Sequence, residues 1–393
     1  MSSWKVKQDF LTANQLDLIR DCIHTGGLEA TTIKVRELGR VGKSGARLLL
    51  CRLARGSPLV AKLHKREDKI KQEYRAMRNV RNLFARDIDT RFKAICRSGD
   101  GVLLYWHQGG VADEQIEDAK VLNEIVYEYD DDGAAFDVDD DTITHYFHKV
   151  FGRFASARAP RIVKRRDICF KIEYKDYIRE PKARKILSSI LGVDETSQGA
   201  DVFGTPICNP LWFIGQPCFD MPYKVKKGPV HGDLHANNVI VDADGDVHLI
   251  DFAWAANSRH VLVDYVLMEN SLRFLLFPHH VNPDLQLLAD TLLLKFDGAK
   301  ELAKVNWNCH LVDHYRRLGL ILTEVRSQAR PYLASQGDDG FLEYLATQFL
   351  ILFGQVSYPD YNQLMGVRAL GLIANELKNN NFGGPSSAVA FAS

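Results

Sequence analysis

Three oxygen-bearing side chains are spaced at short intervals in residues 230–254. Asp233 follows His231 and Gly232, Asn238 comes five residues after Asp233, and Asp251 comes eighteen residues after it. Carboxylate and carboxamide oxygens suit Mg²⁺, a hard cation that keeps several waters and shares its shell with substrate phosphates. These residue types therefore predict a magnesium site at which a phosphate group is handled.

The elements around these residues must bring them together. Apolar runs at 239–241 and 247–250 flank a short stretch of Asp and Gly, a pattern typical of a β-hairpin. Such a hairpin places Asp233 and Asn238 on the loop that enters it and Asp251 just beyond its far end. We therefore expect the three side chains to converge on one point.

Two other interpretations of this stretch remain open. One is a His/Asp cluster like that of metallophosphoesterases. The other is a calcium loop formed by Asp242, Asp244 and Asp246. Ordinary turn chemistry explains the Asp-rich hairpin turn more simply, because Asp and Gly are the residues that turns prefer.

The motif resembles that of the aminoglycoside phosphotransferase and choline kinase family, a branch of the protein kinase-like fold. The sequence HGDL starts at His231, an Asn stands five residues after its Asp, and IDF ends at Phe252. Protein kinases carry H-R-D-L-x-x-x-N followed by D-F-G. In this chain Gly232 replaces the Arg and Ala253 replaces the last Gly. The resemblance implies ATP and Mg²⁺ as cofactors, Asp233 as the base that deprotonates an acceptor hydroxyl, and Asn238 and Asp251 as metal ligands.

A glycine-rich turn between two predicted strands precedes this motif. Gly39, Gly42 and Gly45 could lay backbone N–H groups over nucleotide phosphates. The turn ends like a Walker A loop, but Glu37 occupies the position where that motif requires Gly. The spacing also departs from the kinase G-x-G-x-x-G, so a plain hairpin remains an alternative.

The next strand and helix carry a predicted ion pair. Val60-Ala61-Lys62 is similar to the Val-Ala-Ile-Lys strand of kinases. A lysine among apolar neighbours needs an anionic partner. The resemblance pairs Lys62 with Glu73 of the helix at 66–82 and places both near the nucleotide phosphates; a solvated surface role for Glu73 is the alternative.

A predicted strand at 102–107 leads into the segment where kinases bind adenine. The resemblance makes Tyr105 and His107 candidates for that nucleotide-binding hinge, although aromatic residues here could equally be packing.

The predicted fold class is α+β, a bilobal protein kinase-like fold with a small β-sheet N-lobe and a large, mostly helical C-lobe. We expect an N-lobe at 1–108, a C-lobe at 109–378 and a disordered tail at 379–393. An insertion at about 158–228 is expected to contribute to acceptor specificity.

Composition sets broad limits. The 393 residues have 46% hydrophobic residues and zero formal net charge, as expected for a globular protein without a global preference for nucleic acid or membrane. Seven dispersed cysteines favour free thiols in a reducing compartment. No run reaches the ~20 apolar residues of a membrane span. We therefore expect a cytoplasmic protein without a membrane anchor; the oligomeric state is open.

Two segments are strongly charged. Residues 128–141 contain eight acidic residues and no lysine or arginine, whereas residues 158–185 contain eleven basic and four acidic residues. We expect the first to be a solvated loop rather than a calcium site, and the two segments to face each other. The basic segment could also bind an anionic acceptor or nucleic acid.

The predicted activity is Mg-ATP-dependent transfer of the γ-phosphate to a hydroxyl of a small molecule, such as an aminoglycoside- or choline-like alcohol. One alternative is a kinase-fold nucleotide-binding regulatory module of a larger bacterial assembly. Another is a kinase or adenylyltransferase that acts on a macromolecule. Kinship of fold cannot decide among them.

Overall fold

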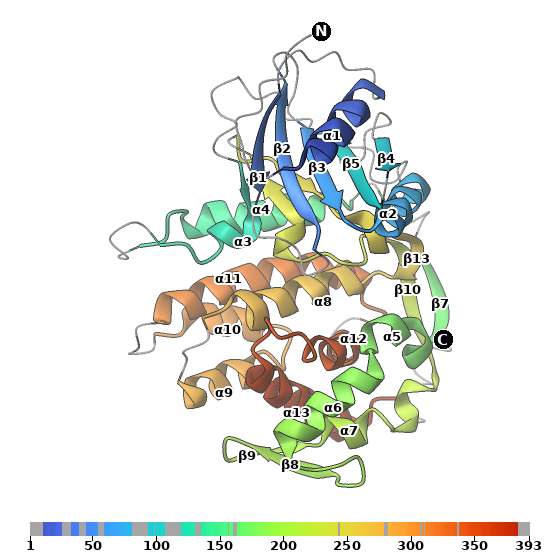
Figure 1. Cartoon of the computed structure of the whole chain (residues 1–393). Helices are drawn as coiled ribbons and strands as arrows, with labels where there is room; N and C mark the ends of the chain where they lie inside the picture. The colour runs from blue at the N-terminus through green and yellow to red at the C-terminus, as the bar shows by residue number, and fades with distance from the viewer. Residues whose placement is uncertain are drawn as a thin grey trace. The chain divides into compact units, whose positions relative to one another are not determined.

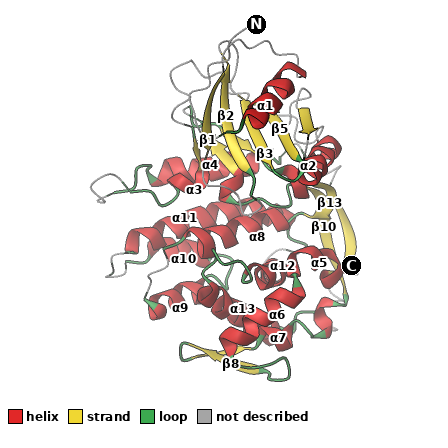
Figure 2. Ribbon diagram, viewed as in Figure 1, coloured by secondary structure: helices red, strands yellow, loops and turns green. Residues whose placement is uncertain are grey.

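The structure is a computed structural model, shown in Figures 1 and 2. It describes residues 11–25, 33–38, 45–53, 59–80, 93–97, 99–106, 119–129, 135–155, 157–159, 163–242, 244–278, 282–306, 309, 311–335 and 338–383.

The chain divides into two compact units, each assembled from separate segments. The first comprises residues 1–138, 149–159 and 229–257, and the second comprises residues 139–148, 160–228 and 258–393.

The first unit contains a five-stranded antiparallel sheet with the order β1-β2-β3-β5-β4. Its strands are β1 (Ile33–Leu38), β2 (Arg47–Leu53), β3 (Leu59–His64), β4 (Lys93–Arg97) and β5 (Asp100–Trp106). Strands β1 and β2, β2 and β3, and β4 and β5 are consecutive antiparallel neighbours, which short connections can join. Strand β3 is followed by a helix, and β4 then pairs on the far side of β5.

Alternation along β3 assigns its residues to two faces. Leu59, Ala61 and Leu63 pack in a cluster with the buried residues of α1 (Ala13–Thr25), which covers that face (Figure 1). Successive side chains of a strand point to opposite faces. Lys62 is therefore directed to the other face, where α2 (Glu67–Val80) packs against β4 and β5.

The predicted hairpin is present in the same unit. Strand β11 (Val239–Val241) pairs with β12 (Val247–Leu249) and, on its other side, with β6 (Lys120–Val121). The Asp242 carboxylate accepts hydrogen bonds from the backbone N–H groups of Asp244 (3.1 Å) and Asp246 (2.8 Å). The carboxylate that opens the turn thus stabilises the turn itself, in agreement with the interpretation as turn chemistry.

The second unit is mostly helical (Figure 2). Its helices are α5 (Phe170–Ile178), α6 (Glu180–Leu191), α7 (Pro210–Phe213), α8 (Val263–Asn270), α9 (Pro283–Leu292), α10 (Gly298–Lys304), α11 (Val312–Ala329), α12 (Asp338–Gln355) and α13 (Gln363–Asn379), with a π-helical stretch at Ser271–Leu276. In the first unit lies α3 (Leu122–Ile125), and α4 (Asp140–Gly152) has residues in both units.

Two small sheets complete the described strands. Strands β8 (Gly199–Val202) and β9 (Thr205–Cys208) form a hairpin, and the other sheet has the order β13-β10-β7. These last strands are β13 (Ala256–His260), β10 (Pro222–Val230) and β7 (Lys164–Cys169).

The basic segment takes part in this second sheet. Lys164, Arg165 and Arg166 are exposed on β7, an edge strand of the sheet. Charged residues on an edge strand discourage pairing with other chains. The local charge thus has a structural explanation that its sequence did not reveal.

Several described residues of the acidic and basic segments have ion-pair partners outside the two segments. Glu128 pairs with Lys120 at 2.8 Å, and Asp140 pairs with Arg317 of α11 at 2.9 Å. In the basic segment, Lys171 pairs with Asp220 at 2.7 Å. Nearby partners of opposite charge exist for each segment, so long-range pairing between the two is not required.

The predicted fold class is confirmed: the chain is α+β, with an N-terminal antiparallel sheet and a mostly helical C-terminal part.

Within the stretch expected to be a tail, Phe382 is buried against Phe170, Phe219 and Tyr223. None of the described helices is long and apolar enough to cross a membrane. All seven cysteines are free.

Candidate active site

A buried lysine lies at the centre of the candidate site. The Lys62 Nζ atom is 2.8 Å from Glu73 Oε2 and 2.6 Å from Asp251 Oδ2, and Lys62 is only 5% exposed. All three residues belong to the first unit. The structure thus brings together the pair predicted from the strand and the helix with the predicted metal-binding aspartate.

Helix α2 positions Glu73. Ile70, Glu73, Met77 and Val80 form its buried face at helical spacing. The same helix packs against the turn at Phe252–Trp254 that follows Asp251. One helix therefore brings the glutamate next to the lysine strand and lies against the segment that carries the aspartate.

The cluster contains two carboxyl groups but only one ammonium group, that of Lys62, so its charges do not balance if both carboxyl groups are ionised. Burial opposes the charge on Lys62, but Asp251 and Glu73 raise its pKa. Burial also opposes ionisation of Asp251, yet the ammonium lowers the pKa of that carboxyl group. Burial, together with the nearby Asp251, raises the pKa of Glu73 to about 8. The lysine and the aspartate thus form the charged pair, and Glu73 is the carboxyl group that holds its proton more readily.

Asp251 has a backbone conformation that few residues adopt. Its φ of 63° and ψ of 61° lie in the left-handed region, where Asp and Asn are tolerated better than bulkier residues. Strained backbone of this kind is concentrated at functional sites. The conformation ends the hairpin and presents the carboxylate to Lys62.

The loop that enters the hairpin fixes Asn238. Its Nδ2 atom donates to the backbone carbonyl of Asp233 at 2.8 Å. Because a carbonyl can only accept, this bond defines the orientation of the amide and leaves Oδ1 as the atom that can bind a cation. The Asp233 carboxylate is 35% exposed, so a molecule from solvent can reach it.

Sequence reasoning gave no role to two histidines that organise this loop. His231 is fully buried; its Nε2–H donates to the carbonyl of Ile250 at 2.8 Å, and its Nδ1 is 3.4 Å from the backbone N of Asp233. His231 thus ties the Asp233 loop to the residue before Asp251. His235 lies near both loop residues, with its Nε2 3.3 Å from Asn238 Nδ2 and 3.9 Å from Asp233 Oδ1. The position of His231 two residues before Asp233 was the only sequence signal.

The oxygens of Asn238 and Asp251 match the ligands that Mg²⁺ takes when phosphates and water complete its shell. Among the described residues, no group of three or more His, Cys, Asp and Glu side chains is arranged to hold a metal ion. A cation here would therefore depend on its substrate for several of its ligands, as is usual for Mg²⁺ in nucleotide sites.

The predicted nucleotide-binding residues are only partly described. Gly45 lies in an exposed turn with φ of +79°, the left-handed region that glycine adopts without strain. The backbone of Tyr105 is part of β5, opposite Val60. Gly39, Gly42 and His107 lie outside the described residues.

Comparison with known proteins adds a family match and several similar structures. The sequence profile of a family described as Ternary complex associated domain 9 matches residues 173–352, which is less than half of the chain. No curated protein matches the chain.

Solved structures similar to this chain include choline kinase LicA from Streptococcus pneumoniae. That alignment has 14% identity and a TM-score of 0.43 and covers 93% of this chain and 100% of the other. Aminoglycoside phosphotransferase APH(4)-Ia aligns with 11% identity and a TM-score of 0.44, covering 93% of this chain and 99% of the enzyme. Because the TM-scores are below 0.5, no activity is transferred from these enzymes, and the function rests on the site's own residues.

Proposed function

We propose that the protein is a Mg-ATP-dependent phosphotransferase that transfers the γ-phosphate to a hydroxyl of a small molecule. The observation that carries this proposal is the buried Lys62, which bridges Glu73 and Asp251 beside the ordered loop of Asp233 and Asn238. Phosphoryl transfer requires little from a protein beyond positioning and charge stabilisation. This cluster offers both.

Each residue has a distinct task in this proposal. Lys62 holds phosphate oxygens of the nucleotide, and Glu73 keeps the lysine in place. Asn238 and Asp251 hold Mg²⁺, which neutralises charge on the phosphates when it is bound. The exposed carboxylate of Asp233 orients the acceptor hydroxyl and accepts its proton. Gly39, Gly42 and Gly45 are proposed to cover the phosphates, and Tyr105 and His107 to border the adenine.

The proton-accepting role is tested by Asp233→Asn. We expect the variant to bind ATP with nearly unchanged affinity and to lose about 10² to 10⁴ in turnover, the usual contribution of a general base. The measurement pairs calorimetric ATP binding with an ATP-consumption assay. Turnover close to that of the wild type would remove Asp233 from this role.

The acceptor is identified by a screen. Purified protein with Mg-ATP is offered aminoglycosides, sugars, choline-like alcohols and RNA, and the products are read by mass. Addition of a phosphate mass to a small alcohol supports the proposal. Addition of AMP would instead indicate adenylyl transfer, and modified RNA would indicate a macromolecular acceptor.

A second candidate is a nucleotide-binding regulatory module of a larger assembly. The observation that favours it is the profile match at residues 173–352, because that family's description refers to a ternary complex. ATP turnover measured with and without co-purifying partners separates the two candidates. A cytoplasmic location, where ATP is available and thiols stay reduced, fits either one.

A further inference from the structure

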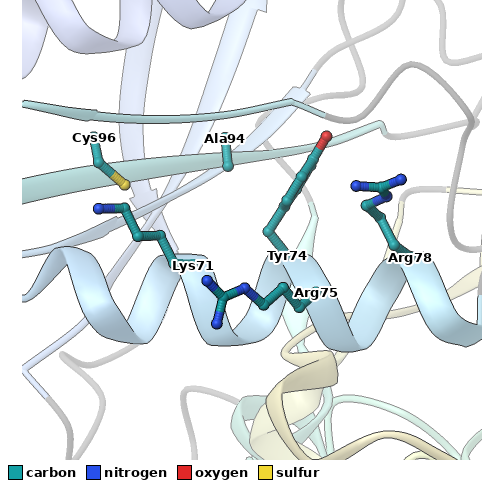
Figure 3. Close-up of a pocket in the computed structure, with 6 residues that line it drawn as sticks. All are labelled: Lys71, Tyr74, Arg75, Arg78, Ala94 and Cys96. Atoms are coloured by element: carbon teal, nitrogen blue, oxygen red, sulfur yellow. The ribbon is translucent and has the colours of Figure 1, made fainter.

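A cavity lies on the outer face of α2, within the first unit (Figure 3). Its volume is about 360 Å³, and it is lined by Lys71, Tyr74, Arg75, Arg78, Ala94 and Cys96. The first four residues come from α2 and the last two from β4. In Figure 3, Tyr74 and Arg78 extend from the helix toward the strand residues, and Lys71 extends toward Cys96.

This cavity is separate from the candidate active site. Glu73 belongs to the buried face of α2, together with Ile70 and Met77. The cavity is formed by the more exposed face of the same helix, on which Arg75 and Arg78 are exposed. The helix thus presents one face to Lys62 and the other to the cavity.

The charge in the cavity is strongly one-sided. Lys71 binds Glu67 at 2.9 Å, and no acidic residue is among the six that line the cavity. Arg75 and Arg78 have no ion-pair partner among the described residues. Lys71, Arg75 and Arg78 are spaced at i, i+4 and i+7, and like charges at such helical spacing destabilise an isolated helix. An anion in the cavity would remove this repulsion.

We propose that this cavity binds a compact, phosphate-bearing small molecule. The two guanidinium groups offer forked N–H donors that match phosphate oxygens, and the Lys71 ammonium adds a third cation. The Tyr74 ring, with the aliphatic stems of the basic side chains, provides an apolar surface for the remainder of the ligand. The volume lies at the lower end of the range for small-molecule pockets.

Occupancy of the cavity would also affect the candidate active site. A ligand that bridges α2 and β4 restrains the helix that carries Glu73, and Glu73 contacts Lys62. We therefore expect bound ligand to increase the affinity for Mg-ATP. This second step rests on the proposed function, whereas binding in the cavity does not.

The test uses the full chain without nucleotide and with a chelator in place of Mg²⁺. Pyrophosphate and AMP are titrated separately by calorimetry: pyrophosphate tests the phosphate contacts alone, and AMP adds a base that could contact Tyr74. The double variant Arg75→Gln/Arg78→Gln is compared with Lys69→Gln, which removes a charge from the same helix outside the cavity.

We expect at least one probe to bind the wild type and Lys69→Gln equally, and the double variant roughly tenfold or more weakly. The melting temperature of the ligand-free double variant should equal or exceed that of the wild type, since like charges are removed. Absence of saturable binding by both probes would overturn the proposal, as would equal binding by all three proteins. Equal binding would place the probe at another site, such as Lys62.

Cys96 gives a readout confined to the cavity. Burial raises the pKa of its thiol, so alkylation is followed at mildly alkaline pH by peptide mass, with Cys169 as the internal reference. A saturating concentration of pyrophosphate or AMP, whichever binds, should slow alkylation of Cys96 severalfold and leave alkylation of Cys169 unchanged. Unchanged alkylation of Cys96 under those conditions would overturn the assignment. Neither result depends on catalysis, so failure of the proposed phosphotransferase activity leaves this test intact.

Discussion

At the residue scale, Gly232 explains why the motif departs from the protein kinase pattern. A Cβ atom at this position would lie 2.3 Å from the backbone oxygen of Trp254, and the φ of Gly232 is +81°. No side chain fits such an approach, so an arginine cannot occupy this position in this backbone. The loop and the turn after Asp251 lie in direct backbone contact because Gly232 has no side chain.

This contact leads to a stability prediction. Gly232→Ala should lower the free energy of unfolding by more than about 2 kcal/mol, because the left-handed φ alone costs roughly 1–2 kcal/mol and the clash adds to it. Gly99→Ala is the matched control: Gly99 has φ of +88° in the same unit, but a Cβ there meets nothing within 4 Å. Denaturant unfolding measures both, and an equal loss in the two variants would show that the contact with Trp254 costs nothing.

The sequence predicted which charged side chains lie together better than it predicted their backbone partners. Lys62, Glu73 and Asp251 lie together as expected, because strand alternation and helical spacing restrict where each can point. The bond from His231 to the Ile250 carbonyl joins segments nineteen residues apart and leaves no periodic signal. Backbone partners of this kind become visible only with the fold.

At the element scale, α2 places the buried carboxyl group of Glu73 next to Lys62 of β3. Burial and the Asp251 carboxylate raise the pKa of Glu73 to about 8, above its ordinary value of 4.5. The folded state therefore binds this proton more tightly than the unfolded state does. The resulting stability is fully present below pH 4.5 and is lost as the pH rises through about 8.

Glu73→Gln tests this linkage. The amide still accepts a hydrogen bond from Lys62 but does not titrate. The wild type should therefore lose stability between pH 5 and 8 relative to the variant, by roughly a few degrees in melting temperature. Glu67→Gln, on the exposed side of the same helix, serves as the control and should follow the wild type. Parallel pH profiles of all three proteins would contradict the assignment of a raised pKa to Glu73.

Helices and strands whose hydrophobic residues recur at a regular spacing were predicted well, and the other elements were not. The alternating strands of the first sheet and the hairpin at β11 and β12 follow the sequence pattern closely. Strand β7 was missed because its sequence KRRDIC has several consecutive charges and no alternation. The apolar run that follows the hairpin becomes helical only at Val263, because residues 256–260 pair in the β13-β10-β7 sheet. Pairing with neighbouring strands, and not local propensity, determined the secondary structure of these segments.

At the scale of the whole molecule, the helical unit is built around a buried ionic network. Glu269 is fully buried; Arg326 binds it through two hydrogen bonds of 2.9 and 2.7 Å, and Arg273 binds it at 3.0 Å. Tyr344 also donates to this carboxylate, at 2.9 Å. Burial opposes its charge, but the arginines lower the pKa of Glu269 to about 2. Arg273 lies four residues after Glu269, but Arg326 and Tyr344 come from α11 and α12, so the sequence of α8 alone did not predict this network.

Removal of this charge should destabilise the protein. Glu269→Gln leaves the buried guanidinium of Arg326 without its anion, whereas Arg273 keeps Asp290 at 3.0 Å. Breaking a buried pair costs about 3–5 kcal/mol. Glu301→Gln, which disrupts only the exposed pair with Lys304, should cost less than about 1 kcal/mol.

The pH dependence of this network has the opposite sign to that of Glu73. Because the pKa of Glu269 is depressed, its stabilisation is present above pH 4.5 and is lost as the pH falls toward 2. The wild type should therefore lose more stability between pH 5 and 3 than Glu269→Gln does, which denaturant unfolding at each pH measures. Equal acid sensitivity of the two proteins would contradict a stabilising role for the ionised carboxylate.

Asp251 is central to the proposed function, because it pairs with Lys62 and is also assigned as a metal ligand. The decisive measurement is a calorimetric titration of a non-hydrolysable ATP analogue into the Asp251→Ala variant, with and without Mg²⁺. The Asp244→Ala variant, which removes an exposed carboxylate of the same hairpin, is the control and is titrated in the same way. We predict that Asp244→Ala keeps the Mg-dependent affinity of the wild type and that Asp251→Ala loses it by roughly tenfold or more. Unchanged Mg-dependent affinity in a folded Asp251→Ala variant would contradict the proposed nucleotide site.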